Sequence, residues 1–369
     1  MKVTPWEVKG DIDYGKLMKE FGIKPMPKLP SAFNKNILFR RKIIFAQRDF
    51  EKILDSIQSK KNFVMMTGLM PSGKFHLGHA IIAQQMSFYQ NLRAKLYIAV
   101  ADLEAYTARQ KNLSELREVA IDQYLKNYIA LGLKPKNCDF YFQSERSKNY
   151  KKANAYYRLA SNFSRHATFN EFKGVYGELS PGKINASLLQ ASDMFHAQLP
   201  EFEGKPLPVV IPVGVDQDPH LRLARGIGSR YKDYKFIQLS STYNIFLPGL
   251  NGNGKMSSSD ETSYIALDDS PKQVEDKIKK YAFSGGGTSI KEHKEKGGNP
   301  DIDVSYQYLT FFEEDDYKLK KIHDDYKSGS LLTSELKQIL IEKLNKFLKE
   351  HQEKRRKADV DKFLNCDVL

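Results

Sequence analysis

The sequence predicts an α/β fold with a parallel sheet, followed by an all-helical domain. Three apolar runs, at residues 62–68, 95–106 and 206–215, have the length and composition of buried strands. An amphipathic helical pattern at residues 77–92 separates the first two runs. Strands that are apolar on both faces and alternate with helices are typical of a parallel sheet covered by helices on both sides.

The pattern along the chain divides it into three parts. Residues 1–60 are expected to form an N-terminal extension, in which a Pro-rich stretch precedes a short strand and a helix. Residues 61–265 contain the predicted sheet, and residues 266–369 show helical spacing almost throughout. Ser270 followed by Pro271 is a helix start signal just after the second boundary.

Composition and charge restrict the classes of protein that this chain can be. Hydrophobic residues make up 41% of its 369 residues, which excludes general disorder. Two cysteines without a CxxC pair exclude a disulfide scaffold and fit a reducing, cytoplasmic setting. No run approaches the ~18 apolar residues of a membrane helix. The formal net charge of +13 favours a polyanionic partner, with a solvated lysine-rich surface as the alternative.

The segment PSGKFHLGH, residues 71–79, lies between a predicted strand and a predicted helix. Junctions of this kind at the carboxyl edge of a parallel sheet bind nucleotides, and helix N-terminal amides attract phosphate. Gly78 would let a base or ribose lie against the backbone, and His76 and His79 can both face a triphosphate. A zinc pair is disfavoured because neither cysteine nor a third histidine lies nearby.

A second segment, GNGKMSSSD at residues 252–260, combines glycines with a lysine and three serines. A mobile loop with one cation and several hydroxyl donors suits the binding of a leaving pyrophosphate. The alternative interpretation is an ordinary polar linker at a domain boundary.

The two segments together resemble the paired motifs of class I aminoacyl-tRNA synthetases. The sequence is similar to tryptophanyl-tRNA synthetases of the archaeal and eukaryotic type over nearly the whole chain, including residues 168–177, 213–225 and 292–309. The resemblance implies a Rossmann-type catalytic domain and a tRNA anticodon-binding helical domain. It also implies ATP-dependent activation of L-tryptophan, with Mg²⁺ on the phosphates, and transfer to tRNA(Trp).

The resemblance also implies site residues. It assigns catalytic roles to His76, His79, Lys255 and Ser257, and ATP contacts to Gly78, Gly214, Val215, Met256, Ser258 and Ser259. It places the amino acid against Met66, Gly68, Glu104, Gln190, Asp193 and Gln217, with Glu104 at the end of a strand. The resemblance implies no metal-binding residue in the protein.

At the indole the sequence departs from the eukaryotic pattern. Those enzymes hold the indole nitrogen with a Tyr and a Gln, where this chain has Met66 and Ala99. Asp193 matches an aspartate that accepts the indole N–H in bacterial enzymes, and we expect it to replace the missing pair. Tyrosyl enzymes carry an aspartate there too, so a tyrosine-specific synthetase of the same fold stays open as the alternative.

Further expectations concern partners. The basic run Lys354 to Lys357 is expected either on a solvated face or against tRNA phosphates. By resemblance we expect a cytoplasmic homodimer, with no DNA or membrane partner. An inactive RNA-binding relative and a small nucleotidyltransferase are disfavoured, because both nucleotide motifs are intact and a long helical region follows them.

Overall fold

The protein is described by a computed structural model, which covers residues 2–3, 8–9, 13–71, 73–109, 111–258 and 260–364. Its main feature is a seven-stranded sheet in the order β3-β4-β9-β8-β5-β6-β7. The strands of this sheet are β3 (Lys24–Pro25), β4 (Ile44–Arg48), β5 (Phe63–Leu69), β6 (Ala94–Val100), β7 (Cys138–Phe142), β8 (Val209–Gly214) and β9 (Ser240–Asn244). A separate antiparallel pair consists of β1 (Lys2–Val3) and β2 (Val8–Lys9).

The sheet is mixed rather than wholly parallel. β5 to β9 run parallel to one another, as predicted, because helical crossovers connect them. β4 pairs antiparallel with β9, and β3 pairs antiparallel with β4, so residues expected in the N-terminal extension lengthen the sheet. Pro25 in the short edge strand β3 cannot donate a ladder hydrogen bond, which suits an edge position.

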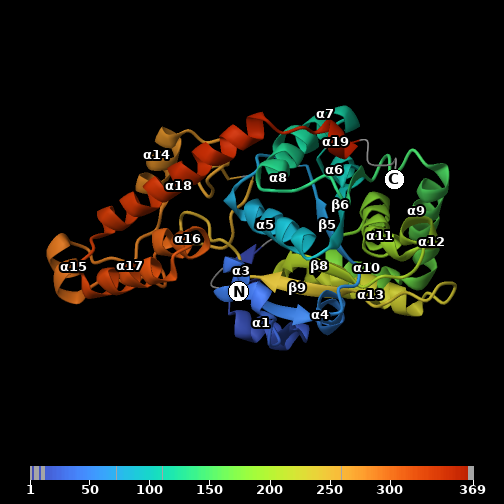
Figure 1. Ribbon diagram of the computed structural model, residues 1–369, viewed down its shortest axis with the longest axis horizontal. Coiled ribbons are helices and arrows are strands. Elements are labelled where there is room, and N and C mark those ends of the chain that lie inside the picture. The colour runs from blue at the N-terminus through green and yellow to red at the C-terminus, as the bar shows by residue number, and fades with distance from the viewer. Residues whose placement is uncertain are drawn as a thin grey trace.

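Helices cover both faces of the sheet. Those of the α/β part are α1 (Tyr14–Phe21), α2 (Ser31–Asn34), α3 (Ile37–Arg40), α4 (Glu51–Gln58), α5 (Leu77–Asn91), α6 (Asp102–Arg109), α7 (Leu113–Val119), α8 (Lys126–Ala130), α9 (Tyr150–Phe163), α10 (Phe169–Tyr176), α11 (Pro181–Phe195), α12 (Pro200–Glu203) and α13 (Asp218–Arg230). Buried residues of α5 pack with Met65 and Ile98 on one face, and those of α11 and α13 pack with Val64 and Ala99 on the other. Figure 1 shows α5 crossing the sheet and α9 and α11 together at its right-hand end.

The C-terminal region is helical, as predicted, and most of it forms the elongated lobe at the left of Figure 1. Its helices are α14 (Pro271–Tyr281), α15 (Ile290–Lys296), α16 (Val304–Phe312), α17 (Asp316–Ser328), α18 (Thr333–Arg356) and α19 (Asp361–Leu364). The side chain of Ser270 caps α14 through a capping box with Gln273, which confirms the predicted start of this helix.

The end of the chain returns to the α/β part. α18 packs along α14 and α16 and then against α8, and α19 lies against β7. Nε2 of the buried His351 lies 2.7 Å from Oδ1 of Asn127. Arg355 donates to the backbone and to the carboxylate of Asp122, at 2.9 and 2.8 Å. These two residues and Phe363, which is 2% exposed, therefore belong to the packing of the α/β part.

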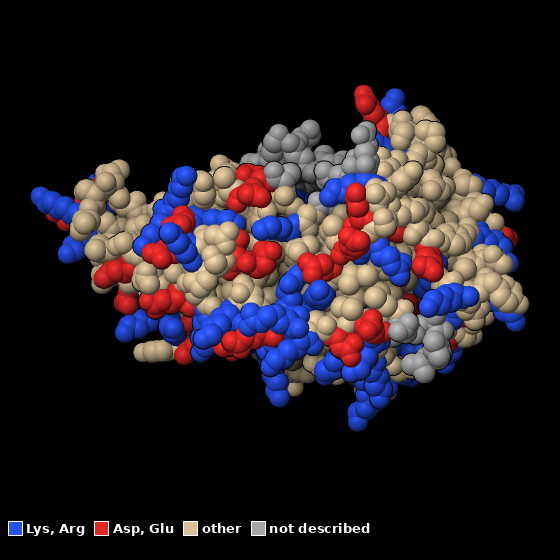
Figure 2. Space-filling view, turned by 90° about the horizontal axis from the view of Figure 1, so that it is seen from above, with Lys and Arg blue, Asp and Glu red and all other residues tan. Residues whose placement is uncertain are grey.

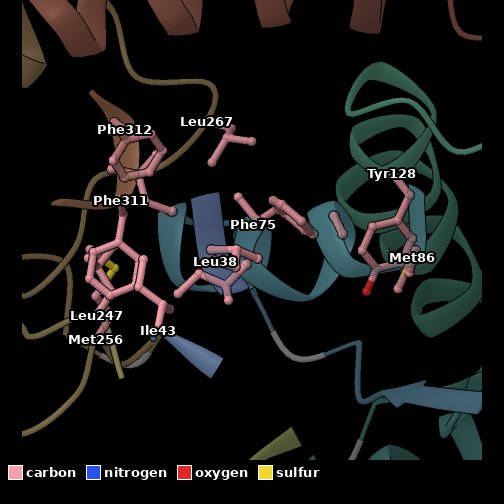
Figure 3. Close-up of a cluster of buried hydrophobic side chains, with 14 of the residues drawn as sticks. Leu38, Ile43, Phe75, Met86, Tyr128, Leu247, Met256, Leu267, Phe311 and Phe312 are labelled. Atoms are coloured by element: carbon pink, nitrogen blue, oxygen red, sulfur yellow. The ribbon is translucent and has the colours of Figure 1, made fainter. Parts of the chain in front are cut away.

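One continuous hydrophobic cluster joins the two parts. Figure 3 shows Phe311 and Phe312 of α16 in this cluster together with Ile43, Leu247, Met256, Phe75, Met86 and Tyr128. Met256 is only 5% exposed, although it lies in the predicted pyrophosphate loop. Burial of this side chain fixes one point of that loop between the sheet and the helical lobe.

No helix in the described part of the chain is both long enough and apolar enough to cross a membrane.

Candidate active site

Two neighbouring cavities open at the carboxyl ends of β5, β6 and β8. One, of about 390 Å³, lies between the segment around His76 and the loop around Lys255. The other, of about 310 Å³, lies between the sheet and α11. Gln217, which ends a 3₁₀ turn after β8, lines both cavities. The sheet edge therefore holds a two-part cleft where a parallel sheet ordinarily binds ligands.

The first cavity is bounded by the N-terminus of α5. Nδ1 of His76 accepts from the backbone N–H of Gly78, and Nδ1 of His79 accepts from the backbone N–H of His76, both at 3.2 Å. The two imidazole rings stack with their centroids 3.8 Å apart. A Cβ on Gly78 would lie 3.0 Å from Cε1 of His76, so a side chain at this position would press on the ring. Glycine at position 78 therefore suits this histidine-capped turn.

Both histidines are uncharged at neutral pH. Burial lowers the pKa of His79 to about 4, and the positive charge of Lys255 acts in the same direction. Burial also lowers the pKa of His76 well below its usual value. Since each Nδ1 accepts a hydrogen bond, the proton of each neutral ring is on Nε2. The pair can therefore offer N–H donors to a phosphate without carrying charge.

The opposite wall is the loop that contains Lys255. Gly252 and Gly254 have φ values of 77° and 61°, a backbone region that favours glycine and explains this part of the motif. Nζ of Lys255 lies 2.6 Å from Oδ2 of Asp216, which is 2% exposed. The same ammonium lies 5.5 Å from the centroid of the Phe246 ring. The cation thus points into the cavity and is held there by a buried carboxylate.

The second cavity has an apolar floor. Met66 and Ala99, from adjacent strands, line it together with Gln143, which directly follows β7. Asp193 and Gln190 of α11 line its other side.

Asp193 is fully engaged with protein groups. Its Oδ1 accepts from the hydroxyls of Tyr141 and Tyr156, at 2.7 and 2.8 Å, and its Oδ2 accepts from Nε2 of Gln143 at 2.6 Å. Burial raises its pKa to about 6, so the carboxylate is ionised at neutral pH. Burial likewise raises the pKa of both tyrosines, which therefore act as donors. The oxygens expected to face an indole N–H already accept three hydrogen bonds.

Glu104 lies on a helix rather than at the end of a strand, which corrects our expectation. β6 ends at Val100, and Asp102 opens α6, where its Oδ1 accepts from the backbone N–H of Leu103. Acidic residues stabilise the first turn of a helix. The apolar residues of the run 95–106 had nevertheless indicated one continuous strand, so the start of this helix was missed. Burial raises the pKa of Glu104 to about 7, with a further contribution from the charge of Asp193. Glu104 and Gln190 also line an adjoining cavity of about 360 Å³.

Comparison with known proteins decides the family. The family model "tRNA synthetases class I (W and Y)" matches residues 58–349. A tryptophan–tRNA ligase of Methanocaldococcus jannaschii is 42% identical over 97% of this chain and 96% of its own length. The chain belongs to the tryptophanyl-tRNA synthetase family. A second member, from Hyperthermus butylicus, is 41% identical over 97% of this chain and 95% of its own length.

Solved structures of tryptophanyl-tRNA synthetases have the same fold. The crystal structure of the Aeropyrum pernix enzyme matches with a TM-score of 0.88 and 39% identity, over 95% of each chain. That of the Plasmodium falciparum enzyme matches with a TM-score of 0.84 and 33% identity, over 96% of each chain. The predicted fold class, a class I synthetase α/β fold with a helical C-terminal region, is confirmed.

In this synthetase fold, residues of both motifs line the same cavity. Residues that line the first cavity include His76, Gly78, His79, Gly214, Lys255, Met256, Ser257 and Ser258. Residues that line the second include Met66, Gly68, Glu104, Gln190, Asp193 and Gln217. Val215 is fully buried in the core beneath the cleft and lines neither cavity. Ser259 lies outside the described residues.

Among the residues of the cleft that sequence reasoning missed are Asp216, Phe246 and Gln143. Asp216 lies between two predicted site residues in the segment VGVDQ, and an acid directly after a buried strand was the available signal. A Cβ on Gly214 would lie 2.5 Å from Cε1 of Phe246 and 2.6 Å from Oδ1 of Asp216, so these groups close over the backbone there. Gln143 follows the apolar residues of β7 in the same way, whereas no comparable signal marked Phe246. Within the described residues no group of three or more potential metal ligands is found.

Proposed function

We propose that the chain activates L-tryptophan with ATP and transfers the product to the 3′ end of tRNA(Trp). The observation that supports this most directly is the two-part cleft, in which Gln217 borders both the cavity between the synthetase motifs and the cavity above the sheet. ATP would occupy the first cavity and tryptophan the second. The ATP enters with its Mg²⁺ as a substrate complex.

In the activation step a carboxylate oxygen of tryptophan attacks the α-phosphorus of ATP. A bond forms between them, the bond to the β-phosphate oxygen breaks, and pyrophosphate leaves. The protein supplies positioning and charge neutralisation rather than a covalent nucleophile. Lys255 would transfer its ion pair from Asp216 to the leaving pyrophosphate. His76 and His79 would donate Nε2–H to the phosphates, with the hydroxyls of Ser257 and Ser258 opposite them.

The ammonium of tryptophan needs acceptors at the mouth of the second cavity. We assign it to Glu104, Gln190 and Gln217, all of which line that cavity. Of these three, Glu104 is the acidic residue, so it is the one whose ionised form makes an ion pair with the ammonium, while the two amides accept from it as neutral groups.

The tRNA would bind partly through charge. The chain has a formal net charge of +13, and Figure 2 shows Lys and Arg side chains over much of one face, interspersed with Asp and Glu. In the basic run, Lys354, Arg356 and Lys357 are exposed and suit phosphate contacts, whereas Arg355 is paired with Asp122. We propose that the helical region from residue 266 binds the anticodon, and that the protein acts as a cytoplasmic homodimer.

Amino-acid-dependent exchange of labelled pyrophosphate into ATP tests the activity. We expect exchange with tryptophan and little with tyrosine, because relatives that are 42% and 41% identical are tryptophan–tRNA ligases. Lys255→Ala should abolish most of the exchange, while Lys272→Ala, which changes an exposed lysine, should not. Exchange with tyrosine alone, or with neither amino acid, would refute the proposal.

A further inference from the structure

The wall of the second cavity, where we place tryptophan, contains a buried polar atom that has no hydrogen-bond partner among the described residues. Gln143 is 1% exposed, and its Oε1 accepts no hydrogen bond from any described residue. Its backbone is fully paired, since its N–H donates to the carbonyl of Val100 at 3.0 Å and its own carbonyl accepts from the hydroxyl of Tyr157 at 2.7 Å. A buried acceptor with no partner is costly and unusual in a native protein. Such an atom in a ligand cavity indicates that the ligand supplies the donor.

The orientation of this amide is fixed by Asp193. The carboxylate of Asp193 can only accept hydrogen bonds when it is ionised. It therefore requires the NH₂ group of Gln143, and Nε2 lies 2.6 Å from Oδ2. The hydroxyls of Tyr141 and Tyr156 hold the other carboxylate oxygen, so Asp193 cannot turn away. With Nε2 bound in this way, Oε1 is the atom of the amide that remains available.

The position of Gln143 matches the place where an indole would lie. Alternate residues of a strand face the same side, so Gln143, just after β7, follows Tyr141 on the face covered by α11. Met66 and Ala99 line the same cavity, and neither side chain has a nitrogen or oxygen atom that could accept a hydrogen bond from an indole N–H. Glu104 and Gln190 also line the adjoining cavity of about 360 Å³, and Gln217 also lines the first cavity. These three residues therefore lie towards the openings of the second cavity.

We infer that Oε1 of Gln143 accepts the indole N–H of tryptophan, and that Asp193 is a positioning residue that orients the Gln143 amide. The inference rests on the proposed tryptophan activation and names the group that selects the side chain. Under this inference Asp193 lines the cavity that would hold the indole, but it acts through Gln143 and does not contact the indole nitrogen. A ligand without a donor at this point would leave Oε1 buried and unpaired, which is the stronger form of rejection in a binding site.

The test compares tryptophan with β-(1-benzothiophen-3-yl)alanine, in which sulfur replaces the N–H. The ratio of kcat/KM for the two in pyrophosphate exchange measures the contribution of the N–H. In Gln143→Met the ratio should fall by about 10- to 100-fold relative to the unmodified protein. Gln58→Met, the same change at an exposed position, should leave the ratio unchanged. A ratio unchanged in Gln143→Met, with tryptophan still activated, would overturn the assignment of Gln143.

Asp193→Asn gives a second, independent readout. The amide that this change introduces would keep an oxygen towards the two tyrosines and present its NH₂ group to Gln143. The Gln143 amide would then turn and direct its own NH₂ into the cavity. The preference should shift from tryptophan towards β-(benzofuran-3-yl)alanine, whose ring oxygen accepts a hydrogen bond. A loss of activity equal for both substrates would overturn the positioning role. If the unmodified protein activates no tryptophan, the proposed function fails first, and this result is distinct from the other two.

Discussion

The proposed role of Glu104 predicts that tryptophan binding depends on pH near neutrality. Burial and the charge of Asp193 both disfavour the ionised carboxylate, which raises the pKa of Glu104 to about 7. If Glu104 accepts the substrate ammonium, as proposed, the ammonium binds the ionised form, so kcat/KM should increase as the pH rises through 7. From the fraction ionised, the increase between pH 6.5 and pH 8 should be about fourfold. Neither histidine of the motif contributes, because the pKa of His79 is about 4 and that of His76 is also lowered.

Glu104→Gln provides the decisive variant. It removes the titrating group and replaces a charged acceptor by a neutral one, so kcat/KM at pH 8 should fall by about 10- to 100-fold. Its pH profile between 6.5 and 8 should also become flat. Asp193 does not replace the lost titration, because its pKa is about 6 and it is mostly ionised in this range. Glu118→Gln, on an exposed position of α7, is the matched control and should retain the fourfold rise. A fourfold rise that persists in Glu104→Gln would show that another group binds the ammonium.

Three further predictions follow from the same structure. Lys255→Ala should slow single-turnover formation of the adenylate by about 10²- to 10³-fold, with the Kd for tryptophan unchanged; a loss confined to binding would contradict its role at the pyrophosphate. Phe363→Ala should lower the free energy of unfolding in urea by about 3–5 kcal/mol, while exposed Lys357→Ala should change it by less than about 0.5 kcal/mol; equal effects would show that α19 does not stabilise the fold. Light scattering at micromolar concentration should give the mass of two chains, and the mass of one chain would reject the proposed dimer.

The sequence predicted best those elements whose signal is local. The runs at 62–68 and 206–215 became β5 and β8 within a few residues, because buried parallel strands need continuous apolar stretches. The start of α14 was equally clear, since capping chemistry depends on neighbouring residues. The antiparallel strands β3 and β4 were not placed in the sheet, because pairing of β4 with β9 joins residues almost 200 positions apart.

The site followed the same division. His76 and His79 lie in one motif of nine residues, and Lys255 lies in another. Because each motif is local, a role for these residues could be predicted from the sequence. The partners of these residues could not, because the ion pair of Lys255 with Asp216 depends on how two loops meet. Asp193 lines the second cavity, and its three hydrogen bonds come from β7, the residue after it, and α9, so they are visible only in the folded chain.

The return of the C-terminus to the sheet has a consequence for synthesis of the protein on the ribosome. His351 contacts Asn127 across a separation of 224 residues, and α19 lies on β7. The surfaces of α8 and β7 that these segments cover therefore stay open to water while most of the remaining chain is translated. Contacts of such long range make folding slow and leave apolar surface exposed in the interim. A chain truncated shortly before its C-terminus would therefore lose more than a peripheral segment. It would leave the surfaces of α8 and β7 exposed to water.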